Sequence, residues 1–405
     1  MIVDLNGTLR PLWWGLDKEG GADPELATAI RQAVQDIEKR QVSIHEGNKR
    51  HARIYAGYLP SGLSVGTSPS ANVRTPFAAT KALIRSVCDT ATAMIVRSRP
   101  RPSFVTEGAD FKIQQAAEDM DQFMIGAYTV GNLYQVAPRA FHDSTIFGTG
   151  GWKLVTKGSG DTFRVQYERI IIDDIVVDED ECREDVVPVN LFHRTIVRTE
   201  ALLRKYADGD DAEAKDRRSK ILAAANSNEW PNMHLPKDRA VLVEAFHVDP
   251  DYPDASRRVL CAAGVVLEDE HWPHKFHPFE FLWWSIPQTG FYGDGIAYRQ
   301  FGRQERITYM HKWIQKVLDL YATPTAWVDP VGGPPTLQMS NEIGKVIMAR
   351  RPPVFQTQQI VPPEVYRWLD KLESDGYEDE GISYVTAANQ LPPGLESAPA
   401  QREYS

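Results

Sequence analysis

Three histidines stand at a spacing that metal sites use. His271, His274 and His277 fall in the stretch EHWPHKFHPF, and neutral imidazole is a common zinc ligand. Pro273 and Pro278 interrupt the same stretch, so it cannot form one regular helix that would bring the three rings together. No Cys or carboxylate ligand is fixed beside them by spacing. We therefore expect turn histidines rather than a metal site, and we predict no cofactor.

Two further polar stretches could bind a phosphate or a divalent cation, but neither has the complete sequence motif of such a site. Residues 148–151 read GTGG, which could cradle a phosphate, yet the spacing matches neither a P-loop nor a dinucleotide fingerprint. It favours a glycine turn before a strand. Residues 173–187 read DDIVVDEDECREDVV, and carboxylates bind divalent cations, but the run lacks EF-hand spacing. We expect a solvated acidic loop there.

Motifs of covalent or hydrolytic catalysis are missing from the sequence. It contains no GxSxG, no HExxH and no Cys/His pair in a local catalytic signature. Dispersed aspartates and glutamates could form a hydrolytic pair, but spacing singles out none. The three cysteines, Cys88, Cys182 and Cys261, lie far apart. Their odd number argues against a disulfide framework and favours a reducing compartment.

The aromatic stretch LWWSIPQTGFYGDG, residues 282–295, combines large rings with three glycines. Trp283 and Trp284 could form a stacking platform for a sugar or a base. Tryptophan pairs more often anchor a core or an interface, and we favour that interpretation. Because glycine adopts backbone angles that other residues resist, the stretch predicts a sharp, packed corner before a helix.

Length and charge limit the classes of function. A chain of 405 residues with 42% hydrophobic residues can form two or three domains. No apolar run reaches the ~18 residues of a membrane span, and the N-terminus lacks a secretory signal. The net charge of −10 differs from the basic surplus of proteins that grip DNA through phosphates. The protein should not hold DNA tightly.

The first 295 residues predict one α+β body, with helices before an antiparallel sheet. Thr75 and Pro76 form a helix start, and Asp110 is an N-cap for a second helix. From Gly151 the apolar period changes to two, and GWKLVTKGSGDTFRVQYERI predicts a hairpin. PVNLFHRTIV, AVLVEAFHV and RRVLCAAGVVLE predict further strands, and Thr199 is expected to cap a short helix between them.

The remaining residues predict two helices separated by a proline-rich segment. The first, 296–322, has an apolar stripe and a charge of +3 from five bases and two acids. The second begins at Pro362 and Pro363, and residues 364–380 carry two bases and seven acids, hence −5. The chain stops in what looks like the start of another helix, so we expect the natural protein to continue.

The order of these segments resembles the portal proteins of tailed bacteriophages, particularly those of short-tailed phages. In that family a mixed α/β wing ends in a glycine- and aromatic-rich turn, which LWWSIPQTGFYGDG resembles. A stem helix follows, similar to IAYRQFGRQERITYMHKWIQKVLDLYA, and then a clip and a second stem helix. GISYVTAANQLPPGLESAPAQREYS resembles the tunnel loop and the start of a channel-side helix. RSRPRP and HDSTIFGTGGWKL fit the N-terminal order. The resemblance covers most of the chain, but no single motif in it is diagnostic.

The resemblance implies a domain order and two departures from it. The expected segments are a wing (1–295), a first stem helix (296–322), a clip (323–361), a second stem helix (362–380), a tunnel loop (381–396) and the start of a channel-side helix (397–405). The second stem helix is shorter than the first. The segment that would return to the wing and form a crown is missing.

The resemblance also implies a function without catalysis. The expected assembly is a ring, by resemblance dodecameric, at one capsid vertex of the virion, formed in the host cytoplasm. Double-stranded DNA would be driven in by a separate terminase and would later leave through the ring. Head–tail adaptor, major capsid and scaffolding proteins would be partners. The alternatives are another virion structural protein, such as an adaptor or tail component, and a metal-dependent hydrolase.

Specific residues follow from this interpretation. The polar tip of the tunnel loop would line the channel: Ala388, Asn389, Gln390 and Leu391. Basic and acidic residues of the stem helices would pair between neighbouring copies: Arg299, Arg303, Arg306, Lys312, Lys316, Asp370 and Glu373. Clip cations would meet a partner: Lys345, Arg350 and Arg351. The wing–stem corner would contain Trp283, Trp284, Gly290, Phe291, Tyr292, Gly293 and Gly295.

Overall fold

A computed structural model shows an α+β protein with antiparallel sheets. It describes residues 2–3, 9–10, 13–16, 24–57, 81–97, 101–106, 110–158, 160, 163–182, 187–209, 211–226, 238–262, 265–322, 325–327, 354–356 and 361–382. The chain divides into two compact units, the first formed by 1–55 with 88–299 and the second by 56–87 with 300–405.

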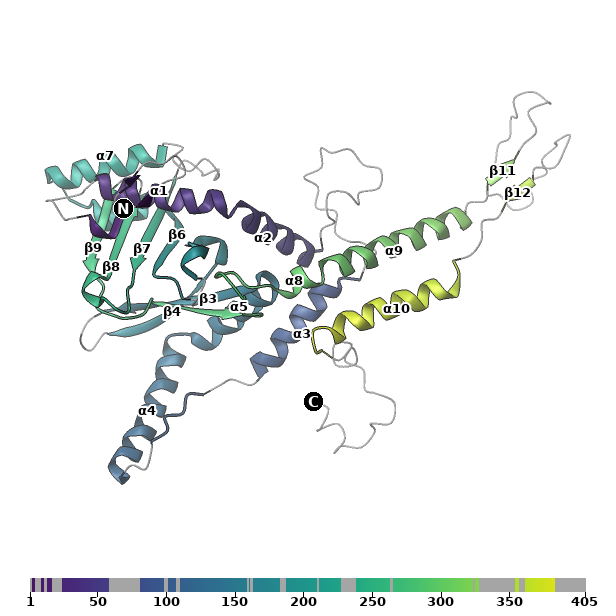
Figure 1. The fold of residues 1–405 in the computed structure, drawn as a ribbon, viewed down its shortest axis with the longest axis horizontal. Helices are drawn as coiled ribbons and strands as arrows, with labels where there is room; N and C mark the ends of the chain where they lie inside the picture. The colour runs from purple at the N-terminus through teal and green to yellow at the C-terminus, as the bar shows by residue number, and fades with distance from the viewer. Residues whose placement is uncertain are drawn as a thin grey trace. The chain divides into compact units, whose positions relative to one another are not determined.

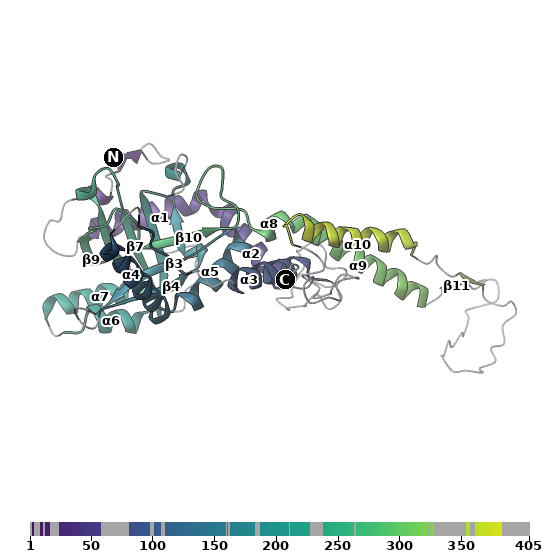
Figure 2. The ribbon, with the colours of Figure 1, turned by 90° about the horizontal axis from the view of Figure 1, so that it is seen from below.

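The first unit is built on a five-stranded antiparallel sheet in the order β5-β6-β7-β8-β9. Its strands are β5 (Ile175–Val177), β6 (Asn190–Arg198), β7 (Arg239–His247), β8 (Arg257–Ala262) and β9 (Val265–His271). Side chains alternate between the two faces of a strand. Along β7, Val241 and Val243 pack on α1 (Pro24–Arg40), whereas Ala240 packs toward α6 (Thr199–Tyr206) and α7 (Ala212–Asn226). The two helical layers therefore lie on opposite faces of the sheet (Figure 2).

A smaller antiparallel sheet in the order β10-β3-β4 completes the core of this unit. Its strands are β3 (Thr149–Lys157), β4 (Arg164–Ile170) and β10 (Phe279–Trp283). Leu191 and Phe246 of the larger sheet share a buried cluster with Ile170 and Phe279 of the smaller one. Burial of such side chains contributes roughly 1.5–3 kcal/mol each. The two sheets are thus joined by one hydrophobic core.

The remaining helices and short elements of the first unit lie around these sheets or extend away from them (Figure 1). They are β1 (Ile2–Val3), β2 (Leu9–Arg10), η1 (Trp13–Gly15), α2 (Val42–Tyr55), α4 (Phe111–Val130), α5 (Leu133–Phe147), η3 (Ile172–Asp174), η4 (Glu179–Cys182), η5 (Pro253–Ala255) and α8 (Ile296–Arg299). Helix α3 (Leu83–Arg97) begins in the second unit and ends in the first.

The second unit contains an antiparallel pair of helices, α9 (Phe301–Ala322) and α10 (Pro363–Glu378) (Figure 1). At one end, Arg303 in the first turn of α9 pairs with Asp379, which follows the end of α10, at 2.6 Å. At the other end, β11 (Thr325–Trp327) pairs with β12 (Val354–Gln356) in antiparallel register. The start of α3 packs on this pair, since the Tyr377 hydroxyl donates to Ser86 Oγ at 2.9 Å.

Two sequence expectations are confirmed, and two others hold only in part. Asp110 caps α4 by accepting a hydrogen bond from the Phe111 amide. The strands β3 and β4 form the predicted hairpin. Residues 257–271 form two paired strands rather than one. The helix expected over 296–322 is interrupted at Gln300, which separates α8 from α9.

Two further expectations were wrong, and a third falls on residues outside the described part of the chain. Thr199 does not cap α6, because it is the first helical residue and its hydroxyl has no hydrogen-bond partner. The acidic run is no solvated loop, since Ile175, Val176 and Val177 within it form the buried strand β5. The predicted helix start at Thr75 and Pro76 lies outside the described residues. In the part of the chain that the structure describes, no helix has the length and apolarity to cross a bilayer.

Candidate functional site

Two backbone segments of the first unit approach each other closely at what we call the glycine corner. It contains Gly148, at the end of α5, and Gly290, Gly293 and Gly295, between β10 and α8. Helix α5 ends at Gly148, whose φ is +90°. The Trp284 amide donates to Gly148 O at 3.0 Å, and the Gly293 amide donates to Thr149 Oγ1 at 2.9 Å. A Cβ atom added at Gly148 would lie 1.9 Å from Gly293 O. Only glycine fits at this position, for both conformational and steric reasons.

Two further glycines of the predicted corner are needed for comparable reasons. Gly290 has a φ of +86° and donates its amide to Cys182 O at 3.1 Å. At Gly295 an added Cβ would lie 2.6 Å from Ile146 O. The segment between β10 and α8 is therefore pinned to the end of α5 and to η4.

Aromatic rings fill the inside of this corner. Phe291 is fully buried and packs edge-on against Phe281 with ring centroids 4.8 Å apart. The Trp283 indole donates to Phe291 O at 2.9 Å, and the Tyr292 hydroxyl donates to Ile175 O at 3.0 Å. Burial, reinforced by the nearby Glu179 charge, raises the pKa of Tyr292 well above its ordinary value. Trp283 therefore serves as a packing anchor rather than a face of an open stacking platform.

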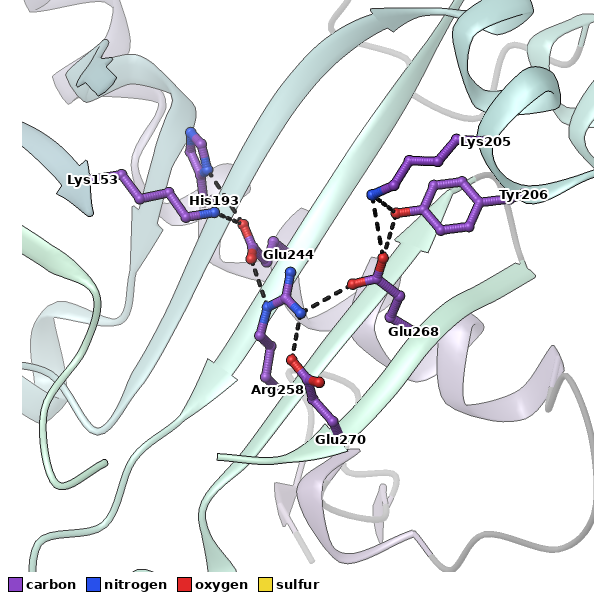
Figure 3. Close-up of polar contacts among 8 residues, drawn as sticks. All are labelled: Lys153, His193, Lys205, Tyr206, Glu244, Arg258, Glu268 and Glu270. Carbon is purple, nitrogen blue, oxygen red and sulfur yellow. Dashed lines mark hydrogen bonds and ion pairs between the residues drawn. The ribbon is translucent and has the colours of Figure 1, made fainter. Parts of the chain in front are cut away.

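A network of charges lies on the five-stranded sheet (Figure 3). Arg258 is its centre, with Nε 2.7 Å from Glu244 Oε1 and Nη1 3.0 Å from Glu268 Oε2. Lys153 from the smaller sheet also pairs with Glu244. Tyr206 from α6 donates to Glu268 Oε1 at 2.5 Å. The network thus ties both sheets and a covering helix together through charge-assisted hydrogen bonds.

The protonation state of Glu244 follows from this network. Burial acts to raise the pKa of Glu244, but a hydrogen bond with His193 and the charges of Lys153 and Arg258 outweigh it. The pKa of Glu244 is therefore well below its ordinary value. The pKa of Arg258 is raised because the neighbouring carboxylates outweigh its burial. A carboxylate held ionised so firmly is a structural charge and a poor general acid.

The acidic run contributes its charges to the fold of the first unit. Asp173 accepts a hydrogen bond from Asn48 Nδ2 at 2.7 Å, and Arg40 Nη2 lies 2.7 Å from Asp178 Oδ2. Glu181 Oε1 accepts from Asn190 Nδ2 at 2.7 Å. Burial raises the pKa of Asp174 to about 6. Among the described residues, no three His, Cys, Asp or Glu side chains converge as a metal site would require.

The three histidines of the HxxHxxH stretch do not converge. His271 Nδ1 lies 2.9 Å from Ser256 O, whereas His277 Nε2 lies 2.7 Å from Pro188 O. The His274 ring stacks on Phe276. Burial lowers the pKa of His277 to about 4, so its ring is neutral at pH 7. His274 and His277 lie between β9 and β10, as expected for turn histidines, whereas the expectation was wrong for His271, which is the last residue of β9.

The helical pair of the second unit has a buried and an exposed face. Ile307, Met310 and Ile314, three members of the predicted stripe, are buried. An exposed face carries aromatic and basic side chains, and Arg306 lies over the rings of Tyr309 and Trp368 at 5.8 and 5.2 Å. We define the α9/α10 aromatic face as Arg306, Tyr309, Trp313, Tyr366 and Trp368, whose four aromatic members are each 38–49% exposed.

Sequence reasoning overlooked this aromatic face. Tyr309 and Trp313 are four residues apart and therefore adjacent on a helix, which was the available signal. Arg, Tyr and Trp are the residue types that dominate binding energy at protein interfaces. The arrangement can therefore provide an interaction surface.

The predicted stem cations and acids have different surroundings. Arg303 pairs with Asp379 of the same chain, and Glu373 pairs with Lys81. Arg299 in the first unit and Arg306, Lys316 and Asp370 in the second are exposed. Lys312 is half-buried, and burial lowers its pKa. Outside the described residues lie Ala388, Asn389, Gln390, Leu391, Lys345, Arg350 and Arg351.

No protein-family model matches the chain, and no curated protein has a significantly similar sequence.

Proposed function

We propose that this chain is a portal protein, a ring-forming channel for double-stranded DNA at one capsid vertex. The observation that carries the proposal is the helical pair of the second unit. Its two antiparallel helices are joined through the β11–β12 ribbon, in the order expected for stem, clip and stem. The α+β body and the glycine corner precede this pair in the chain, as a wing and its exit turn would.

The α9/α10 aromatic face supports assembly into a ring. Exposed Tyr, Trp and Arg side chains form energetically important contacts when a partner buries them. A neighbouring copy can bury this face with a different surface of its own, and such a heterologous contact closes into a ring when the rotation is right. Lys316 and Asp370, which are exposed, can then pair between copies at the edge of the contact.

The net negative charge of the chain suits a channel that DNA passes through without being bound tightly. A net charge of −10 and the uncharged Asn389 and Gln390 of the proposed tunnel loop would leave phosphates without strong partners. Affinity for DNA depends mainly on cations that neutralise phosphates. DNA can therefore slide through the ring, driven by a separate terminase, while Lys345, Arg350 and Arg351 of the proposed clip meet a protein partner.

Electron microscopy with light scattering tests the proposal directly. The full chain should form rings with a central hole wide enough for duplex DNA and a mass that is a whole multiple of 45.6 kDa. A longer chain that includes any C-terminal continuation controls for a closure defect. If both chains stay monomeric, the portal assignment is wrong. Rings without a helical stem would instead favour an adaptor or tail component.

A further inference from the structure

Helix α4 of the first unit exposes an apolar stripe. Ile113, Met120, Phe123 and Val130 fall on one side at helical spacing, and their exposed fractions are 55%, 45%, 68% and 62%. No residue of α4 is buried. The apolar side of a helix normally faces a core, and a helix gains most of its stability from packing that side. We therefore expect another surface to pack against this stripe.

The contacts that hold α4 in the first unit leave this stripe uncovered. At its C-terminal end, the Tyr128 ring packs on Tyr167 at 6.1 Å, and Gly131 O accepts from the Tyr167 amide at 3.1 Å. At its side, Asp121 Oδ1 accepts from the Phe104 amide at 2.8 Å. Over the described residues, these contacts position the helix without burying its N-terminal half.

The exposed apolar area is large enough for a stable interface. We define the α4 patch as the exposed apolar stripe of α4 with two side chains of the segment that hydrogen-bonds to the helix: Phe104, Val105, Ile113, Met120, Phe123 and Val130. From ordinary side-chain areas, it exposes on the order of 700 Å². A single side of a standard interface buries about 800 Å², whereas the largest apolar patch of a monomer is typically about 300–600 Å².

We infer that the α4 patch docks on a second copy of this chain. A patch dominated by Phe, Ile, Val and Met matches the apolar interfaces of permanent assemblies more closely than those of transient ones. The surface that buries the α4 patch must be present whenever the chain folds, and another copy of the chain meets that condition. The choice of occupant rests on the proposed ring, and it adds a contact in the first unit to the proposed stem contact in the second.

Thiol protection tests this contact within the assembled protein. The native cysteines are buried, so Phe123→Cys introduces one accessible thiol in the patch, and Gln122→Cys places a matched thiol at an exposed position outside the stripe. In the assembly, maleimide should label the thiol at position 123 at least 10-fold more slowly than the thiol at 122. After dissociation in mild urea, the two rates should converge. Met120→Cys repeats the measurement if position 123 prevents folding.

A charge-bearing pair of variants gives the second readout. Ile113→Glu with Phe123→Glu should shift the mass from ring to monomer or small oligomer, with unchanged helical circular dichroism. Gln115→Glu with Gln122→Glu adds the same charge to an exposed part of the helix and should preserve the ring. Equal labelling at 122 and 123 in intact rings would overturn the α4 inference and leave the portal proposal standing. A monomeric wild-type chain would overturn both.

Discussion

Gly148 is the position where the corner leaves the least room for a side chain. Gly148→Ala should lower the free energy of unfolding by at least ~1–3 kcal/mol, because alanine is strained at a φ of +90° and its Cβ would meet Gly293 O. Gly126→Ala is the matched control, since Gly126 lies within α4 with open space around its Cα. That substitution should be neutral or stabilise by ~0.5–1 kcal/mol. Urea unfolding measures both, and equal effects would contradict the proposed crowding.

Glu244 holds two cations in the sheet network. Glu244→Gln should destabilise the protein by about 3–5 kcal/mol at pH 7, because Lys153 and Arg258 would lose their shared anion. Glu270→Gln removes the more exposed partner of Arg258 and should cost less than ~1 kcal/mol.

The same network predicts a pH dependence at Glu244. Its folded pKa lies below the ordinary value of 4.5, so its stabilisation is present above about pH 4.5 and is lost as the pH falls toward the folded pKa. The excess stability of the wild type over Glu244→Gln should therefore shrink at acidic pH. Urea unfolding from pH 3 to 7 measures this difference, and a difference that stays constant would contradict the assignment.

Asp174 has the opposite dependence. Its folded pKa of about 6 exceeds the ordinary 3.8 because burial disfavours the charge, so the folded state binds the proton more tightly. The wild type therefore loses stability as the pH rises through this window. Asp174→Asn should become more stable than the wild type as the pH rises from 4 to 7. Thermal unfolding at several pH values measures the trend, with the exposed Asp251→Asn as control. A constant difference would contradict the prediction.

The α9/α10 aromatic face should contribute to the contact between neighbouring copies in the proposed ring. Trp313→Ala should weaken the proposed ring, raising the concentration at which it dissociates by at least 10-fold, because tryptophan anchors in interfaces often contribute 2 kcal/mol or more. Gln315→Ala changes an exposed position on the opposite side of α9 and should leave assembly unchanged. Sedimentation across a concentration series distinguishes the two. Equal dissociation would exclude the aromatic face from the interface.

The strands and helices could be predicted to different extents. The hairpin of β3 and β4 and the N-cap at Asp110 depend on local patterns, so both were predictable. The strand β5 was missed because three buried residues interrupt an acidic run, and charges on either side hide so short an apolar signal. Thr199 has the residue type of a cap, but the adjoining strand β6 ends directly before it and Thr199 itself becomes helical.

At the scale of the whole molecule, the portal proposal predicts weak and salt-dependent contact with DNA. Asn389→Lys with Gln390→Lys should raise the affinity of the ring for duplex DNA and steepen its salt dependence, because each added cation that meets a phosphate releases counterions. Gln122→Lys with Gln115→Lys adds the same charge to α4 as a control. Fluorescence anisotropy at 50 and 200 mM salt measures both. An equal gain in the two variants would place the tunnel loop away from the DNA.

The sequence by itself determined the α+β class, the helices α4, α9 and α10 and the need for glycine near residue 290, because these depend on periodicity and on local backbone geometry. It did not predict α1, α2, α5 or α7. Only the tertiary structure decided that Gly148 meets Gly293 and that Arg303 and Glu373 have partners within the chain. It also decided that the apolar side of α4 stays exposed while that of α9 is buried. The spacing of apolar residues indicates that a helix has an apolar side. Which surface covers that side depends on contacts between residues far apart in the chain.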